Sequence, residues 1–123
     1  MSLNNIQIRN INKESDLEHF TEFLNLAHAD YPGHQDMSVD IVKQYIFGAP
    51  DFEEKANFLA IENSKIIGTA QGDIESEEAG FIAMLILPEN RYKGLEEIFY
   101  DTVAEYLASK GKKVLRAMVH AKF

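Results

Sequence analysis

The fold is decided by one stretch, Phe81-Ile82-Ala83-Met84-Leu85-Ile86-Leu87-Pro88-Glu89-Asn90-Arg91-Tyr92-Lys93-Gly94-Leu95-Glu96-Glu97-Ile98-Phe99. Its apolar first half predicts a strand that ends at Pro88, and a basic turn containing Gly94 leads into an amphipathic helix. A helix start presents unpaired N–H groups and a favourable dipole to anions, so a phosphate fits at this turn. Glu96 and Glu97 in the first helical turn oppose such an anion. Whether the turn holds a phosphate is therefore the central functional question.

The composition of the whole chain excludes several classes of function. Its 123 residues suit a single domain, 1–123, with one hydrophobic core. A net charge of −8 has the wrong sign for general binding to nucleic acid or acidic membranes. No apolar run approaches the roughly 20 residues that span a bilayer, and no signal-peptide pattern opens the chain. The chain has no cysteine, which excludes disulfides and thiolate metal sites and is compatible with a cytoplasmic location.

The first half of the chain predicts one strand and two helices. Apolar and polar residues alternate in the strand, as expected when one face is buried. A capping box, with Ser15 as N-cap and Glu18 three residues later, begins the first helix. Ser38 caps the second, shorter helix, which Gly48 ends. The expected elements are a strand over 6–11, a helix over 15–28, a loop over 30–36 and a helix over 38–47.

The second half predicts a three-stranded meander followed by a helix and a last strand. Asn63 and Ser64 form the tight turn of the first hairpin. The third strand of the meander is apolar at nearly every position, so we expect both of its faces to be covered. The expected elements are strands over 57–62, 65–73 and 79–87, a helix from 95 that stops at Gly111, and a strand over 113–119.

This order, β-α-α-β-β-β-α-β, predicts an α/β fold with a mixed, mainly antiparallel sheet. The last two strands flank a helix, so we expect them to lie parallel with a right-handed crossover. The earlier hairpins are antiparallel, and helices should cover both faces of the sheet.

Element order and the strand–turn–helix sequence together resemble the GCN5-related N-acetyltransferase (GNAT) family. The family's acetyl-CoA signature reads roughly V-x-P-x-x-[RQ]-G-x-G-[IV]-[GA]. The residues that fit it are Pro88, Arg91, Gly94 and Leu95, and Lys93 is common at its position. The resemblance implies a GNAT-like acyl-CoA N-acyltransferase fold that lacks the last helix and strands of the family.

The resemblance also implies a cofactor and a reaction. In the family, the strand backbone pairs with the pantetheine arm of acetyl-CoA, and the turn wraps its pyrophosphate. The implied cofactor-binding residues are Met84, Leu85, Ile86, Arg91, Lys93, Gly94 and Leu95. The implied reaction transfers an acetyl group from acetyl-CoA to an unidentified small-molecule amine or peptide amine.

Three departures from the family pattern leave alternatives open. Tyr92 stands where the family usually has glycine, Glu96 stands where it has glycine or alanine, and the chain stops at Phe123, before the family's last elements. One alternative is an N-acetyltransferase completed by a second copy. Another is a degenerate GNAT-like domain, such as the N-terminal part of a longer protein, that serves binding, regulation or dimerisation. A third keeps the anion site for a different phosphate-bearing ligand.

No catalytic residue can be assigned from the sequence. The strand over 81–87 has no carboxylate that could act as a general base, and the acidic residues just before it lie in a solvated turn. His28, Asp30, His34 and Asp36 sit close together, but their spacing fits no defined metal motif, so we expect a polar loop and no metal site.

The last strand is expected to lie at the edge of the sheet. Its apolar residues Val114, Leu115, Met118 and Val119 would then be exposed unless a partner covers them. We therefore expect a homodimer or a downstream domain that is missing from this chain.

Overall fold

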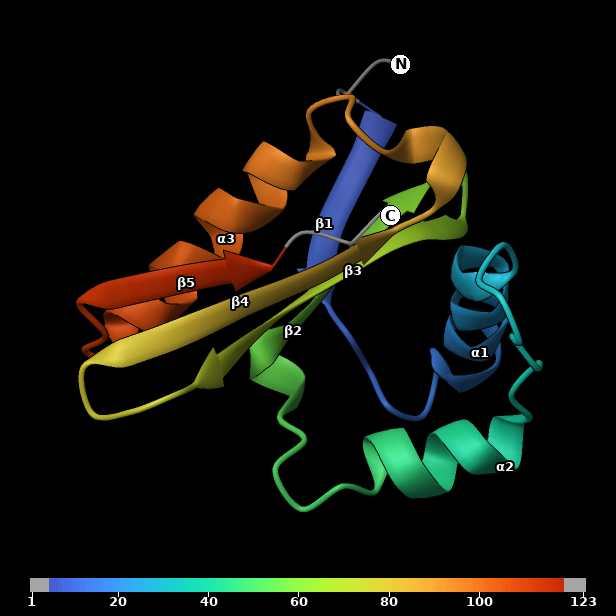
Figure 1. Ribbon diagram of the computed structural model, residues 1–123, viewed down its shortest axis with the longest axis horizontal. Helices are drawn as coiled ribbons and strands as arrows, with labels where there is room; N and C mark the ends of the chain where they lie inside the picture. The colour runs from blue at the N-terminus through green and yellow to red at the C-terminus, as the bar shows by residue number, and fades with distance from the viewer. Residues whose placement is uncertain (1–4, 119–123) are drawn as a thin grey trace.

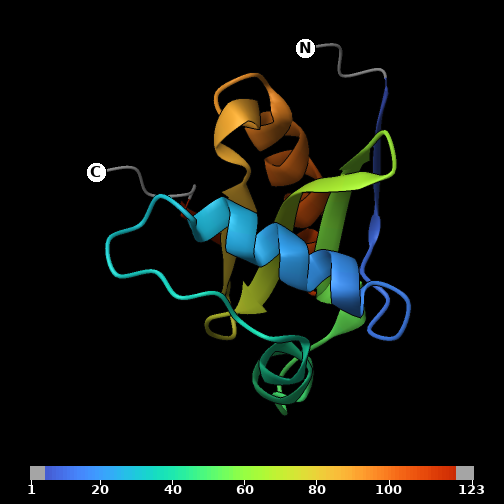
Figure 2. The same cartoon turned by 90° about the vertical axis from the view of Figure 1, so that its right-hand side faces the viewer.

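A computed structural model describes residues 5–118 as a five-stranded mixed sheet with helices on both faces (Figures 1 and 2). The strands lie in the sheet in chain order, with the first three pairings antiparallel and the last parallel. The elements are β1 (Ile6–Asn10), α1 (Leu17–His28), α2 (Val39–Ile41), η2 (Val42–Phe47), η3 (Glu54–Ala56), β2 (Asn57–Glu62), β3 (Lys65–Ile74), β4 (Ala79–Ile86), η4 (Pro88–Asn90), α3 (Leu95–Ser109) and β5 (Val114–Met118). The predicted element order and the predicted parallel pair are confirmed.

The hairpin between β2 and β3 turns through two residues with left-handed backbone. Asn63 and Ser64 have φ of 51° and 63°. Positive φ at both central residues is the geometry whose twist matches that of the flanking strands. The predicted hairpin is confirmed, with one irregularity in register between Ala60 and Ile61.

Helix α3 packs unusually close to the sheet because three glycines face it. A Cβ atom added at Gly68, Gly72 or Gly80 would lie 2.9, 2.9 or 2.8 Å from the nearest side-chain atom of α3. The α3 residues that meet these glycines are Phe99, Val103 and Leu107, and all three are fully buried. The contacts fix the height of α3 above the sheet, and so they fix where its N-terminus lies relative to the end of β4.

The other face of the sheet is covered less completely, by α1 and the α2–η2 segment. Along β4, alternate residues from Gly80 to Ile86 are buried, while those from Ala79 to Leu85 are half-buried. The prediction that both faces of β4 are covered therefore holds fully for the α3 face and in part for the α1 face. The helices there do not close over the strand, and the resulting gap forms part of the site described below.

The start of α1 differs from the predicted capping box. The N-cap is Asp16 instead of Ser15, and its side chain caps no helix N–H. Its buried carboxylate instead accepts two hydrogen bonds of 2.8 Å from the Arg9 guanidinium and one of 2.8 Å from the Asn12 N–H. The bonds from Arg9 are the largest cause of a lowered Asp16 pKa. The carboxylate thus ties the helix start to β1, which no local cap pattern reveals.

The second helix begins as expected, with the Ser38 hydroxyl accepting a hydrogen bond of 3.2 Å from the Ile41 N–H. It then widens into a π-helical segment, η2, which ends at Gly48. A Cβ at Gly48 would lie 2.6 Å from the Gln44 carbonyl, so the end of η2 requires glycine. None of the described helices is long and apolar enough to cross a membrane.

Candidate functional site

Within the described residues, the pairing of β4 with β5 ends before β4 does. Its ladder with β3 continues to Ile86, but its described ladder with β5 stops at the pair Ala83 and Met118. The Leu87 N–H donates a hydrogen bond of 2.9 Å to the Ile67 carbonyl of β3. Successive residues of a strand point their N–H and C=O groups to opposite edges, so those of Met84 and Ile86 point away from β3. No strand among residues 5–118 pairs with that edge beyond Ala83. An extended ligand with amide groups can pair with such an edge.

Beyond β4 the chain makes the predicted turn into α3. Tyr92 and Gly94 both have left-handed backbone, with φ of 62° and 105°, and Gly94 is the N-cap of α3. Tyr92 is unusual in this respect, because a side chain disfavours that conformation and glycine does not. The Glu96 carboxylate reaches back and accepts a hydrogen bond of 2.6 Å from the Tyr92 N–H. One N–H of the turn that would face a phosphate is therefore bonded to the chain's own carboxylate.

Arg91 lies beneath the turn, with only 4% of its surface exposed. Its Nε donates a hydrogen bond of 2.8 Å to the Ile86 carbonyl at the end of β4, and its Nη2 donates one of 3.4 Å to the Ala27 carbonyl of α1. Its Nη1 is buried without a hydrogen-bond partner among the described residues. Buried donors normally find an acceptor. Arg91 therefore joins β4 to α1 and leaves one donor for an acceptor from outside this part of the chain.

The remaining predicted cofactor-binding residues differ in exposure, and Leu85 is half-buried. Lys93 is exposed on the turn. Met84, Ile86 and Leu95 have buried side chains, and Leu95 packs against the position of Gly68. For these three, any contact with a ligand has to come from the backbone. The resemblance implies backbone contacts for Met84, Leu85 and Ile86, and cofactor binding by all of these residues stays a prediction.

The loop after α1 brings a second set of polar residues near Arg91. Burial lowers the pKa of His28, the positive neighbours His34 and Arg91 lower it further, and Asp30 acts in the opposite direction. The His28 ring packs 5.1 Å from that of Tyr31. The His34 Nε2 lies 2.9 Å from an Asp36 oxygen. In the part of the chain that the structure describes, no three histidine or carboxylate side chains form a group suited to a metal.

An apolar chamber of about 240 Å³ lies beside the middle of β4, on the α1 face. Its walls come from Phe20 and Leu24 of α1, from residues of η2 and of the segment before η3, and from β2, β3 and β4 up to Leu85. None of the side chains that line it is titratable. No local sequence pattern marks this chamber, because five separate elements form it.

No protein-family model matches the chain, and no curated protein matches it in sequence. Solved structures do match its fold. The aminoglycoside N-acetyltransferase AAC(6')-Iy, solved in complex with CoA, matches with a TM-score of 0.64 and 24% identity over 92% of this chain and 76% of that chain. An N-acetyltransferase from Staphylococcus aureus Mu50 matches with a TM-score of 0.68 and 18% identity over 92% of this chain and 72% of that chain. A GCN5-related N-acetyltransferase from Sphaerobacter thermophilus matches with a TM-score of 0.72 and 11% identity over 89% of this chain and 34% of that chain.

The chain therefore has the fold of the GCN5-related N-acetyltransferases, a mixed α/β sheet with helices on both faces. The predicted resemblance and fold class are confirmed. It spans 34% to 76% of the three chains compared. At these identities the similarity concerns the fold alone.

Proposed function

We propose that this chain is an acetyl-CoA-dependent N-acetyltransferase domain that acts on an amine. The observation that carries the proposal is the end of β4, where no strand within residues 5–118 pairs beyond Ala83 and the Ile86 N–H points away from β3, directly before the turn at the start of α3 and beside the apolar chamber. A strand edge suits the amides of a pantetheine arm, and a helix start suits a pyrophosphate. The similar fold of AAC(6')-Iy, which was solved with CoA, supports the same ligand here.

In this proposal the chain contributes binding and orientation. The pantetheine arm pairs with the edge of β4 and directs the thioester toward the chamber, whose walls are mainly apolar. The lone pair of a neutral amine forms a C–N bond to the acetyl carbonyl carbon, and the C–S bond breaks. The proton lost by nitrogen ends on the sulfur of CoA, so charge and atoms balance. Holding both reactants in place supplies much of the rate, as in other intramolecular-like reactions.

A second function, a GNAT-like domain without catalysis, is favoured by the bond between Glu96 and the Tyr92 N–H. A phosphate at about 4 Å from a carboxylate costs about 1 kcal/mol in bulk water and about 4 kcal/mol at an effective dielectric of 20. Those values correspond to affinity losses of about fivefold to a thousandfold. Glu96 is half-buried, so the cost lies between these limits unless the side chain rotates into solvent.

Calorimetric titration with CoA, acetyl-CoA, pantetheine and ADP separates these readings. Acetyl transfer requires micromolar binding of CoA and acetyl-CoA, with pantetheine and ADP each binding more weakly. Tight binding of ADP alone would instead indicate a different phosphate-bearing ligand. No CoA binding at about 1 mM would mean a binding free energy weaker than about 4 kcal/mol. That result would overturn the proposal and favour the domain without catalysis.

Turnover is measurable without background. The chain has no cysteine, so a thiol reagent reports only the CoA thiol that acetyl transfer releases. A panel of primary amines with acetyl-CoA should give thiol release that depends on the amine. Release at the same rate without any amine would indicate hydrolysis and contradict N-acetyl transfer.

A further inference from the structure

The apolar chamber beside β4 bears on the acyl group that a CoA thioester would bring to this chain. Its volume is about 240 Å³. An apolar cavity of about 150 Å³ already holds a molecule of the size of benzene. The single methyl of an acetyl group would therefore leave most of the chamber unfilled, whereas a chain of about five to seven carbons beyond the carbonyl would occupy it.

The chamber lies where a thioester held on the edge of β4 would end. A pantetheine arm that runs back from the turn at the start of α3 reaches Ala83, where the described pairing with β5 begins. The group beyond the thioester must there turn onto one face of the sheet. On one face α3 packs so closely that a Cβ at Gly80 would lie 2.8 Å from Leu107. On the other face Ala83 and Leu85 line the chamber, so that face offers the space for an acyl chain.

The polar side chains that line the chamber already donate their hydrogen bonds elsewhere. The Thr69 hydroxyl donates one of 3.0 Å to the Phe58 carbonyl. The Asn57 amide donates one of 2.7 Å to a backbone carbonyl, and the Gln71 amide donates to the Asp73 carboxylate at 3.1 and 2.9 Å. None of the lining side chains is titratable. A charged group would lose its hydration here without gaining an opposite charge, whereas methylene groups gain from burial. The chamber therefore suits an uncharged alkyl chain.

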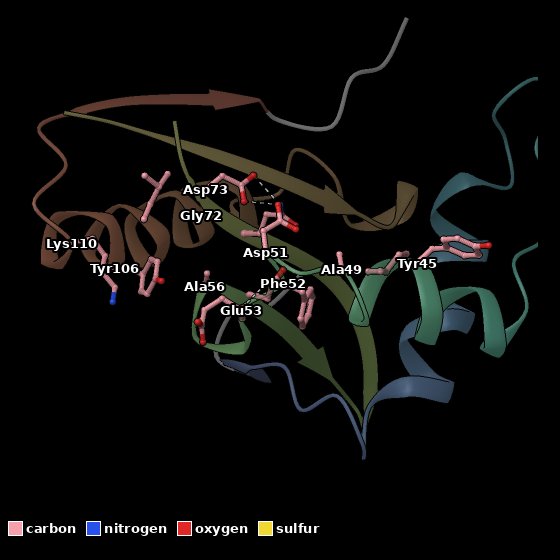
Figure 3. A pocket seen from close by; sticks show the side chains of 14 residues that line it. Tyr45, Ala49, Asp51, Phe52, Glu53, Ala56, Gly72, Asp73, Tyr106 and Lys110 are labelled. Carbon is pink, nitrogen blue, oxygen red and sulfur yellow. Dashed lines mark hydrogen bonds between the residues drawn. The ribbon is translucent and has the colours of Figure 1, made fainter. Parts of the chain in front are cut away.

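A wider cleft limits the length of that chain. The cleft has a volume of about 630 Å³ and adjoins the chamber, with which it shares Ile46, Phe52, Asn57 and Gln71 (Figure 3). Three carboxylates also line it, those of Asp51, Glu53 and Asp73 (Figure 3). Methylene groups that extend beyond the chamber would lie beside these carboxylates and gain little from burial.

We propose that the chamber binds the acyl chain of a medium-chain acyl-CoA, so that this chain accepts hexanoyl and octanoyl groups and binds them more tightly than acetyl. This binding rests on the proposed function, because the acyl chain reaches the chamber only as part of a thioester held on β4. The transfer keeps the same balance. The amine nitrogen bonds to the acyl carbonyl carbon, the C–S bond breaks, and the proton from nitrogen ends on the sulfur of CoA.

The test is calorimetric titration of the intact chain with CoA and with its acetyl, butyryl, hexanoyl, octanoyl and decanoyl thioesters. Each added methylene should raise the affinity by about two- to fourfold, so hexanoyl-CoA should bind at least about tenfold more tightly than acetyl-CoA. The gain should level off beyond octanoyl-CoA, where the chamber is full. A gain that continues undiminished to decanoyl-CoA would place the acyl chain on an open surface and overturn the assignment to the chamber.

The same titration separates this proposal from the proposed function. Equal affinities for acetyl-CoA and hexanoyl-CoA would overturn the acyl site and leave acetyl transfer standing. Absence of binding by CoA and by all of its thioesters would overturn both.

A matched pair of variants locates the acyl chain. Ala83→Leu places a larger side chain in the chamber and should reduce the preference for hexanoyl-CoA over acetyl-CoA to about threefold or less. Ala79→Leu is the control, because Ala79 is also half-buried and lies on the same face of β4 but does not line the chamber. It should keep the wild-type preference. Equal losses of preference in both variants would overturn the proposal.

Thiol release distinguishes the acyl chain from an apolar part of the acceptor. Ethylamine and hexylamine are each supplied with acetyl-CoA and with hexanoyl-CoA. The rate at low thioester concentration should rise with the length of the acyl chain. A rate that rises only with the length of the amine would assign the chamber to the acceptor and overturn the proposal.

Discussion

At the scale of single residues, Glu96 decides whether the turn is open to an anion. We predict that Glu96→Ala raises CoA affinity by about tenfold or more, because it frees the Tyr92 N–H and removes a like charge. The same change should lower the free energy of unfolding by about 0.3–1 kcal/mol, since a carboxylate in the first turn stabilises an empty helix. Glu96→Gln separates the two effects, because the amide keeps an acceptor for Tyr92 but loses the charge. Unchanged CoA affinity in both variants would show that Glu96 does not restrict the turn.

His28 makes a residue-scale prediction about pH. Its pKa lies below the ordinary 6.5 in the folded chain, chiefly through burial. Between that folded pKa and 6.5 the unfolded chain binds more protons, so stability falls as pH drops below about 6.5. We predict that His28→Gln flattens this dependence in urea unfolding between about pH 7 and pH 5. His19→Gln, at an exposed position on α1, is the control, and an equal flattening there would contradict the assignment to His28.

Residue-scale features were the hardest to predict from the sequence. The acidic residue at the start of α3 was visible, but its bond to Tyr92 depends on the left-handed backbone of that residue. The burial of Arg91 could not be predicted from the sequence, because a basic residue in a glycine-containing turn indicates an exposed phosphate ligand. Ser15 was misassigned as N-cap because a capping box is a local pattern, whereas Asp16 is held by Arg9 from another element.

At the scale of elements, prediction succeeded where the signal was periodic. Alternation identified β1, the tight turn at Asn63 and Ser64 identified the hairpin of β2 and β3, and helical spacing identified α1 and α3. The crossover rule gave the parallel pair of β4 and β5. The chamber beside β4 could not be predicted from the sequence, because it depends on how several elements lie against one another. The incomplete cover over β4 likewise follows from the placement of α1, which the apolar sequence of β4 cannot reveal.

The close packing of α3 on the sheet makes a prediction at this scale. Gly80→Ala would place a Cβ 2.8 Å from Leu107, so it should lower the free energy of unfolding by about 1–3 kcal/mol. In a double-mutant cycle with Leu107→Ala, part of this loss should be recovered because the clashing side chain is gone. Gly111→Ala is the control, since its cost comes from a φ of 80° with no atom near the added Cβ, and it should show no coupling to Leu107. Strict additivity of Gly80→Ala and Leu107→Ala would contradict the packing argument.

At the scale of the whole molecule, β5 places apolar residues at the edge of the sheet that residues 5–118 form, while Val119, which was predicted to lie there too, is outside the described residues. Val114 and Met118 are 51% and 54% exposed, whereas Leu115 is half-buried against the core, and no strand within residues 5–118 pairs with the outer edge of β5. Such an edge carries unpaired N–H and C=O groups and readily adds another strand. A second copy can supply that strand by two-fold pairing of β5 with β5, which satisfies both edges at once. We therefore predict that the chain self-associates through β5.

Sedimentation velocity at about 10–300 μM, in salt sufficient to screen the net charge of −8, tests this prediction. The wild-type sedimentation coefficient should rise with concentration. Val114→Lys should abolish the rise, because a lysine on an edge strand opposes pairing with a second strand. Leu26→Lys, which places the same charge at an exposed apolar residue of α1, should leave it intact. A wild-type chain that stays monomeric throughout, or one whose association both lysines reduce equally, would show that the edge of β5 is tolerated without a partner copy.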